Sequence, residues 1–392
     1  MRKRYLMPHI LKDLDEKMVF VGGARQVGKT SLATYLAKNH FHHYDYLNWD
    51  YREDRKRILD SRFEGNAEII LFDEIHKYKD WKNYLKGQFD KHKDDFKILV
   101  TGSARLDIYR KGGDSLMGRY YYYRLHPFSI AEFLEKENVI TPFSEINFLE
   151  LANSESYEAL KILLKFGGFP EPLLKQSERT LRRWHNQRAE RLIREDIRDL
   201  ENIRDLSALQ ILIDVLPRKV GSLLSINSLR EDLSVAHKTV AGWIDILERF
   251  YYHFRIYPFT DSKIRSLKKE PKLYLYDWSE VDDGGSKLEN MVASHLLKLC
   301  HYLNDVEGHK TEVYFLRDMD GREVDFLITE KGKPWFAVEV KSSAKDISKN
   351  LFYFSQRLKI PFSYQVVFEK DVDIRKDTVR IISLDRFLAS LV

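Results

Sequence analysis

The residues Gly23-Ala24-Arg25-Gln26-Val27-Gly28-Lys29-Thr30 combine glycines, a lysine and a hydroxyl group at a spacing suited to phosphate binding. The glycines allow the backbone to curl so that consecutive N–H groups point at the phosphates, and a helix that begins here adds partial positive charge. We expect Lys29 to reach the β- and γ-phosphates and Thr30 to bind Mg2+. The run, extended to Ser31, therefore predicts a nucleotide-binding P-loop.

The flanking segments have the patterns that such a loop requires. The apolar residues 18–21 precede it and predict a strand, and residues 31–37 follow it and predict a helix. A strand, a glycine loop with Lys-Thr and a helix form the structural context of a P-loop.

Two acids follow a second apolar run and predict a catalytic strand end. Residues 67–72 lead into Asp73 and Glu74, so the carboxylates lie at the carboxyl end of a buried parallel strand, where ligands bind in open α/β sheets. Asp73 is expected to bind Mg2+ through its water shell, and Glu74 to orient or deprotonate the attacking water. A third strand over 97–101 ends in Gly102-Ser103, which places Ser103 beside the γ-phosphate. Three such strand ends predict an NTPase.

Length and composition limit the remaining possibilities. A chain of 392 residues, 43 % hydrophobic and 32 % charged, is long enough for two to four folded domains and too apolar for a disordered protein. No apolar run approaches a bilayer span and the N-terminus lacks a signal-peptide core, so we expect a cytoplasmic protein with no membrane partner. The single cysteine, Cys300, excludes an internal disulfide and a cysteine-based zinc site.

These motifs resemble a prokaryotic group of AAA+ ATPases that joins an AAA-type domain to a C-terminal domain of formerly unknown function. The resemblance spans roughly residues 15 to 345 and rests on the P-loop, on Phe72-Asp73-Glu74-Ile75-His76-Lys77, and on the later runs 100–104, 116–119, 125–133 and 167–171. It implies an α/β fold, ATP and Mg2+ as cofactors, and possible assembly into a homo-oligomer.

In AAA+ proteins an arginine of one subunit completes the neighbour's active site. Arg119 is the candidate for this arginine finger, with Arg105, Arg110 and Arg124 as competitors, and pairing of Arg119 with a surface acid is the alternative. The resemblance also suggests that Gly167-Gly168-Phe169-Pro170 forms a turn of a helical lid near the adenine, and an ordinary loop is the alternative there.

Residues 225–249 predict a helix-turn-helix, with a first helix over 225–233 and a second that presents Val240, Ile244 and Leu247 on one face. A hairpin from 251–257 to 273–276 would be its wing. The candidate DNA contacts are the start of the second helix, with His237, Lys238 and Thr239, and the basic hairpin loop, with Lys263, Arg265, Lys268, Lys269 and Lys272. A protein-binding role is the alternative, because Asp245 and Glu248 make the second helix less basic.

The C-terminal part resembles the PD-(D/E)XK nuclease superfamily. It shows a helix carrying Glu289, then strands carrying Asp325 and Glu339-x-Lys341, with Val324 where the superfamily usually has proline. Asp325 and Glu339 would hold Mg2+, Lys341 would orient the nucleophile, and Glu289 would add a ligand or support one. A scaffold without turnover is the alternative.

The sequence thus predicts an α/β ATPase in four parts: a P-loop AAA+ core over 1–135, a helical lid with linker helices over 136–205, a winged helix-turn-helix over 206–278, and a nuclease-like domain over 279–392. We expect it to bind and remodel DNA, for which branched or recombining DNA is a candidate. The rival interpretations are a nucleotide-regulated switch, a metal-dependent nuclease licensed by ATP, and a C-terminal half that binds a protein.

Overall fold

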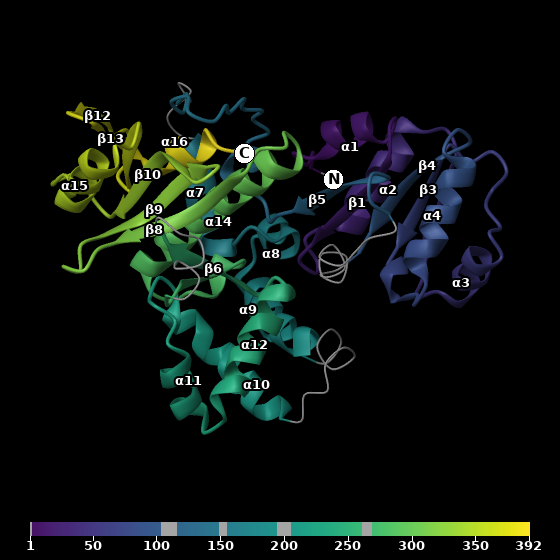
Figure 1. Ribbon diagram of the computed structural model, residues 1–392, viewed down its shortest axis with the longest axis horizontal. Helices are drawn as coiled ribbons and strands as arrows, with labels where there is room; N and C mark the ends of the chain where they lie inside the picture. The colour runs from purple at the N-terminus through teal and green to yellow at the C-terminus, as the bar shows by residue number, and fades with distance from the viewer. Residues whose placement is uncertain (1, 103–115, 149–154, 194–204, 261–268) are drawn as a thin grey trace. The chain divides into compact units, whose positions relative to one another are not determined.

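The computed structural model describes residues 2–102, 116–148, 155–193, 205–260 and 269–392 (Figure 1). Two compact units account for the chain, Met1–His126 and Pro127–Val392. The four-part division of the chain remains a prediction.

The first unit is built on a five-stranded sheet whose paired strands all run parallel, in the order β2-β3-β4-β1-β5. The strands are β1 Met18–Gly23, β2 Tyr44–Asn48, β3 Ile69–Asp73, β4 Lys97–Thr101 and β5 Tyr120–Leu125. Every residue of β1 and of β3 is buried, as the apolar runs in the sequence predict. Because β4 lies between β1 and β3, the glycine loop and the acidic strand end are separated by the carboxyl end of β4.

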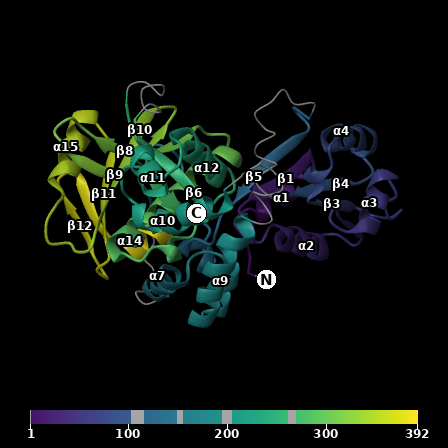
Figure 2. The same cartoon turned by 90° about the horizontal axis from the view of Figure 1, so that it is seen from below.

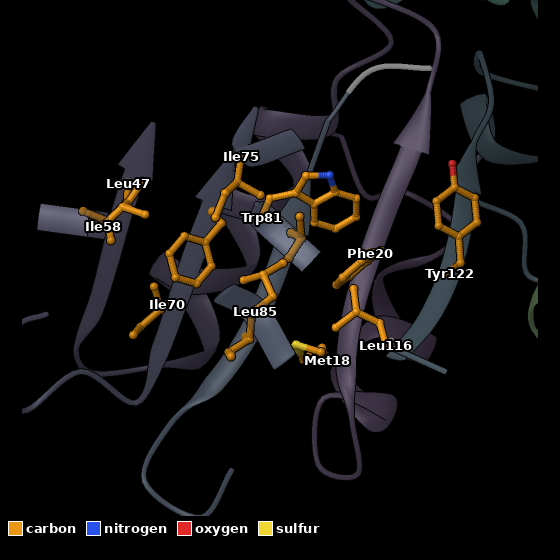
Figure 3. Close-up of a cluster of buried hydrophobic side chains, with 13 residues drawn as sticks. Met18, Phe20, Leu47, Ile58, Ile70, Ile75, Trp81, Leu85, Leu116 and Tyr122 are labelled. Carbon is orange, nitrogen blue, oxygen red and sulfur yellow. The ribbon is translucent and has the colours of Figure 1, made fainter. Parts of the chain in front are cut away.

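Four α-helices complete the described part of this unit: α1 Met7–Asp13, α2 Lys29–His40, α3 Arg52–Leu59 and α4 Trp81–His92. Apolar side chains from the strands, from α3 and from α4 form one core cluster (Figure 3). Phe20 of β1 stacks on Tyr120 of β5 with ring centroids 4.5 Å apart, and it also contacts Trp81 of α4. This core packing fixes the sheet, and with it the positions of the strand ends that carry the candidate site.

Helices form the first half of the second unit. They are α6 Ile130–Phe133, α7 Glu155–Phe166, α8 Pro170–Lys175, α9 Glu178–Arg191, α10 Leu206–Val215, α11 Ile226–Leu233 and α12 His237–Arg249. Several begin at a side chain that accepts a backbone N–H of the first turn, as Ser177 does for α9 and Ser225 does for α11.

Helices α11 and α12 are the two helices expected within 225–249, and their role as a DNA-binding helix-turn-helix remains a prediction. Ser234 ends α11 in the left-handed conformation, with φ of 54°, and this residue turns the chain into α12. Val240, Ile244 and Leu247 are buried on one face of α12, as their spacing predicts.

The second half of this unit is an eight-stranded sheet in the order β12-β13-β11-β10-β9-β8-β6-β7. The strands are β6 His253–Pro258, β7 Lys272–Leu275, β8 Thr311–Arg317, β9 Glu323–Glu330, β10 Lys333–Lys341, β11 Phe362–Val367, β12 Asp373–Lys376 and β13 Val379–Ser383. Helix α14, Gly284–Asp305, packs against β7 and β8. Helix α15, Lys349–Leu358, packs against β9, β10 and β11 (Figure 2).

Two features of this sheet differ from the sequence expectation. The hairpin β6–β7 forms, but β6 also pairs with β8, so a single sheet spans the boundary expected between residues 278 and 279. After β11 the chain continues through β12, β13 and helix α16, Leu384–Ala389, elements that the sequence reading did not predict.

The Gly-Gly-Phe-Pro run lies inside the packing of the second unit. Gly167 has φ of 73°, and a Cβ built on Gly168 would lie 2.6 Å from the carbonyl oxygen of Phe128 and 2.7 Å from Trp278. Close packing therefore explains the second glycine, and positive φ favours glycine at the first. The expected adenine contact remains a prediction.

Within the described ranges, no helix has the length and apolar character needed to cross a membrane.

Candidate functional site

The predicted P-loop connects β1 to α2 with a backbone shaped for an anion. Gln26 and Gly28 both have positive φ, of 60° and 101°, and Gly28 is the N-cap residue immediately before α2. The first N–H groups of α2, from Lys29 onward, have no partner within the helix, and Thr30 and Ser31 are exposed beside them. The geometry provides the cradle of backbone donors that phosphate groups require.

Gly23 fixes how the loop leaves the sheet. Its φ is 140°, and a Cβ there would lie 2.4 Å from the carbonyl oxygen of Leu125 on β5. Only glycine fits so close to the neighbouring strand.

The side chain of Lys29 lies within the loop. Its Nζ donates hydrogen bonds to the carbonyl oxygens of Gly23 at 3.0 Å and Ala24 at 2.8 Å, and the residue is only 8 % exposed. The ammonium group is thus held at the mouth of the loop, where its charge adds to that of the backbone donors.

Asp73, at the end of β3, accepts hydrogen bonds from three hydroxyl groups. Thr30 donates to Oδ2 at 2.9 Å, Tyr46 of β2 donates to Oδ2 at 2.8 Å, and Thr101 of β4 donates to Oδ1 at 2.5 Å. Burial and the charge of Asp73 raise the pKa of Tyr46 to about 12, so that its hydroxyl remains a donor. The carboxylate is therefore fixed beside the hydroxyl of Thr30, as the sequence expects for a shared Mg2+ site.

Glu74 follows Asp73 in a left-handed conformation, with φ of 57°. One oxygen of its carboxylate lies 3.5 Å from His76 Nε2 and 3.5 Å from Lys77 Nζ. Burial raises the pKa of Glu74, while Lys77 and Lys29 act to lower it. A carboxylate whose pKa is shifted toward neutrality is suited to accept a proton from water.

Three supporting residues were not found from the sequence. Tyr46 and Thr101 hold Asp73, and Arg4, only 2 % exposed, donates from NH1 to the carbonyl oxygen of Val27 at 2.8 Å and from NH2 to that of His126 at 2.5 Å. Thr101 ends a strand that the sequence predicts, and this position could have indicated that its hydroxyl lies near Asp73. Nothing in the sequence around Arg4 connects it to the loop.

Arg119 forms a two-point ion pair with Asp90, with distances of 2.6 Å from Nε and 3.0 Å from NH2. The alternative of pairing with a surface acid is therefore present in the structure, and the role as an arginine finger remains a prediction. Ser103 and the competitors Arg105 and Arg110 lie outside the described residues.

The described residues fit a nucleoside triphosphate with Mg2+. The positive-φ loop, the first turn of α2 and Lys29 match a chain of anionic oxygens, and Thr30 with Asp73 supplies the oxygen ligands that Mg2+ prefers to take alongside phosphates. The fold and the site together define a P-loop nucleotide-binding domain.

The candidate DNA contacts are only partly described. His237 and Lys238 are exposed in the first turn of α12, Thr239 is half-buried behind them, and Lys269 is exposed. Lys263, Arg265 and Lys268 lie outside the described residues.

Lys272 corrects the expectation of an exposed basic loop. It is the first residue of β7, its side chain is 4 % exposed, and its ammonium group contacts carboxylates of α14 and β9. A buried and paired lysine cannot contact a phosphate backbone, so the prediction that Lys272 contacts DNA is wrong.

The predicted nuclease-like residues lie close together on α14, β9 and β10. Val340 N–H donates to Asp325 Oδ2 at 2.8 Å, and Asp325 N–H donates to Glu339 Oε2 at 3.3 Å. Lys341 Nζ is 2.7 Å from Glu339 Oε1. Glu289 Oε1 accepts a hydrogen bond from the hydroxyl of Tyr274 at 2.6 Å.

The electrostatics of this cluster are strongly perturbed. Burial and the charges of Glu289 and Glu339 raise the pKa of Asp325 well above its usual range, although Lys272 acts in the opposite direction. Among the residues that the structure describes, no three His, Cys, Asp or Glu side chains are arranged to hold a metal ion. The residues are brought together as predicted, but the buried ammonium group of Lys272 lies 3.2 Å from Glu289 and 3.9 Å from Asp325, where it competes with a metal for these carboxylates.

Family profiles agree with the assignment of the first unit. Residues 15–134 match a family described as an AAA domain, residues 157–279 match a domain of unknown function (DUF8612), and residues 284–387 match a second domain of unknown function (DUF4143). The chain therefore carries an AAA-type P-loop ATPase domain followed by two domains whose families have no described function.

Similar proteins extend over most of the chain. An uncharacterized protein of Methanocaldococcus jannaschii is 25 % identical over 407 residues, covering 95 % of this chain and 88 % of its own. An uncharacterized protein of Haemophilus influenzae is 23 % identical, covering 93 % and 92 %. Among solved structures, the RuvB Holliday junction branch migration motor of Thermotoga maritima is 17 % identical, covers 64 % of this chain and 87 % of its own, and gives a TM-score of 0.32.

Proposed function

We propose that this chain is a Mg2+-dependent ATPase of the AAA+ class whose second unit binds DNA, with branched or recombining DNA as the candidate substrate. The observation that carries the ATPase proposal is the convergence on Asp73 of hydroxyl groups from α2, β2 and β4, directly beside the P-loop. This arrangement holds a metal-binding carboxylate at a fixed distance from the phosphate cradle.

Each residue would have a defined task in hydrolysis. Lys29 would exchange its two carbonyl contacts for oxygens of the β- and γ-phosphates, and Thr30 and Asp73 would hold Mg2+. Bound Mg2+ would neutralise charge that develops on the phosphates. Glu74 would accept a proton from the attacking water, and its raised pKa suits that task. Ser103 remains a predicted contact beside the γ-phosphate.

ATP turnover in Mg2+ tests the ATPase proposal. Lys29→Ala should abolish ATP binding and turnover, whereas Glu74→Gln should retain ATP binding and lose turnover by at least about a hundredfold, the usual size of a general-base contribution. Lys38→Ala, which removes an exposed lysine from the same helix, is the matched control and should behave as the wild type. Unchanged turnover in Glu74→Gln would remove Glu74 from the chemistry, and full activity in Lys29→Ala would refute the site.

The charge around α12 favours a nucleic-acid partner. Asp245 and Glu248, which argue against DNA binding in the sequence, both pair with Arg255, which lies 2.9 Å from Asp245. The single guanidinium offsets one of these two negative charges, and the exposed Lys238 at the start of the helix adds a positive charge that favours an anionic partner.

Binding and turnover with single-stranded, duplex and four-way-junction DNA test this partner. Lys238→Glu should weaken DNA affinity and reduce its dependence on salt, while the matched control Lys349→Glu, at the exposed start of α15, should not. Stimulation of turnover by one DNA structure would identify the substrate. Equal DNA affinity in both variants would assign the helix-turn-helix pair to a protein partner.

The arginine finger is tested by mixing two inactive proteins. If Arg119 acts on a neighbouring subunit, it must leave Asp90 and enter that site. Arg119→Ala and Lys29→Ala should each be inactive alone, and mixing them should restore turnover, because an intact site then meets an intact arginine. Inactivity of the mixture, in proteins shown to associate, would leave Arg119 in its surface ion pair with Asp90.

A further inference from the structure

The ammonium group of Lys272 lies at the centre of the acidic cluster in the second unit. It is 2.6 Å from Glu323 Oε1, 3.2 Å from Glu289 Oε1 and 3.9 Å from Asp325 Oδ1. The three acids come from two elements, α14 and β9, while the lysine comes from the hairpin strand β7. Three elements of the chain, α14, β9 and β7, thus meet around one positive charge.

The ammonium group lies beside Glu289 and Asp325, two of the acids expected around a divalent cation. A metal held by these carboxylates would lie about 2.0–2.6 Å from their oxygens, within the space that the ammonium group fills. Lys272 is 4 % exposed, so the group cannot swing into solvent without opening the hairpin. A cation fixed to the backbone therefore excludes a free one by both volume and charge.

The carboxylates also form hydrogen bonds and ion pairs with other side chains of the unit. Tyr274 donates to Glu289 at 2.6 Å, and Arg317 lies 3.4 Å from Glu323. On the far side, a Cβ on Gly221 would be only 3.2 Å from Glu289, so the backbone closes over that carboxylate. Glu339 likewise forms an ion pair with Lys341, two residues further along β10, at 2.7 Å.

The charge state of the lysine supports the same conclusion. Burial acts to lower the pKa of Lys272, but the carboxylates of Glu289, Asp325 and Glu323 outweigh it and raise that pKa above its ordinary value.

We propose that Lys272 replaces the divalent metal of a nuclease-like site with its own ammonium group, so that the second unit does not bind a metal at this cluster and does not cut DNA there. If the second unit binds DNA as proposed above, it would bind the nucleic acid without hydrolysing it at this cluster. This inference is independent of the ATPase proposal, because it concerns neither the P-loop nor Asp73.

Binding of Mn2+ to the full chain without nucleotide tests the proposal, with free Mn2+ measured by electron paramagnetic resonance. Wild type should show no Mn2+ binding that depends on Asp325, so Asp325→Asn should leave its binding curve unchanged. Lys272→Met ends one atom short of the ammonium position, so it removes the charge and vacates that position while keeping the rest of the side chain. It should bind Mn2+ at least about tenfold more tightly than wild type, a change of about 1.4 kcal/mol. Adding Asp325→Asn to Lys272→Met should abolish that gain.

Two controls complete the experiment. Lys333→Met removes an exposed lysine from β10, with the same change in net charge, and should match wild type. Lys272→Arg keeps a cation and should gain no Mn2+ binding. Wild type that binds one Mn2+ and loses it on Asp325→Asn would overturn the proposal, as would a folded Lys272→Met with no gain. If Lys272→Met does not fold, the comparison of wild type with Asp325→Asn decides alone.

Discussion

The buried imidazole of His295 leads to a quantitative prediction about acid stability. Its Nε2 accepts the backbone N–H of Ile130 at 3.1 Å, and its Nδ1 donates to the carbonyl oxygen of Met291 at 2.8 Å. The contact with Ile130 requires the neutral ring, because a proton on Nε2 would face another N–H group, whereas the Nδ1 contact is compatible with either charge state. Burial, with a smaller contribution from the charge of Lys298, lowers the pKa of His295 from 6.5 to about 3.

The sign and size of the effect follow from this shift. Opening the site returns the imidazole to its ordinary pKa, so the open form takes up a proton below pH 6.5 that the closed form refuses until about pH 3. The stability that His295 contributes is therefore complete above pH 6.5 and is lost as the pH falls below it. Between pH 7.5 and pH 5.0 the loss should be about 2 kcal/mol.

Hydrogen exchange of the Ile130 amide measures this loss directly, because that N–H donates to the imidazole. His295→Gln places an acceptor that does not titrate at the same position. The free energy of opening should fall by about 2 kcal/mol more in wild type than in His295→Gln between the two pH values. His253, a second buried imidazole whose pKa is lowered to about 4, is present in both proteins and cancels in this difference. An equal pH dependence in the two proteins would refute the reasoning.

Three further substitutions test the supporting contacts. Tyr46→Phe removes one of the hydroxyl groups that hold Asp73 and should lower kcat for ATP about tenfold, since a hydrogen bond to a charged group contributes roughly 1.5 kcal/mol or more; unchanged kcat would show that the other hydroxyls suffice. Arg4→Ala removes a buried donor from the carbonyl oxygen of Val27 and should raise KM for ATP by about tenfold, on the same energetic scale, which steady-state kinetics can separate from kcat. Gly168→Ala places a Cβ 2.6 Å from a backbone carbonyl oxygen and should destabilise the second unit by about 1–3 kcal/mol in denaturant unfolding, and a smaller loss would mean that the turn relaxes.

The local order of elements in the first unit was predictable because its signals are contiguous. The apolar run of β1, the glycines and the start of α2 follow one another directly, and Asp73 with Glu74 ends an apolar strand. The same holds for α12, whose buried positions recur at the helical period.

The residues that hold the site in place were not predictable, because they depend on pairing between distant strands. Tyr46 contacts Asp73 only because β2 lies beside β3 in the register Leu47 opposite Phe72 and Asn48 opposite Asp73. Arg4 reaches the loop from before α1, and no periodicity records that path.

Lys272 shows the limit of reading charge from sequence. In the sequence it is the last of five cations within ten residues and is indistinguishable from its neighbours. The pairing of β6 with β7 places it opposite Ile256 and within reach of Glu289, so a solvated charge becomes a buried one. Composition cannot separate these two states, because only tertiary contacts define them.

The pairing of β6 with β8 determines where the chain can be cut into fragments that still fold. The matched families meet between residues 279 and 284, yet the hydrogen-bonded sheet crosses that border, with β6 and β7 contributed by one family and the other six strands by the second. A fragment that begins at residue 284 would expose the edge of β8 and leave Glu289 and Glu323 without Lys272. We therefore expect the two regions to fold as one unit, because a cut between them would separate a sheet from its own edge strands.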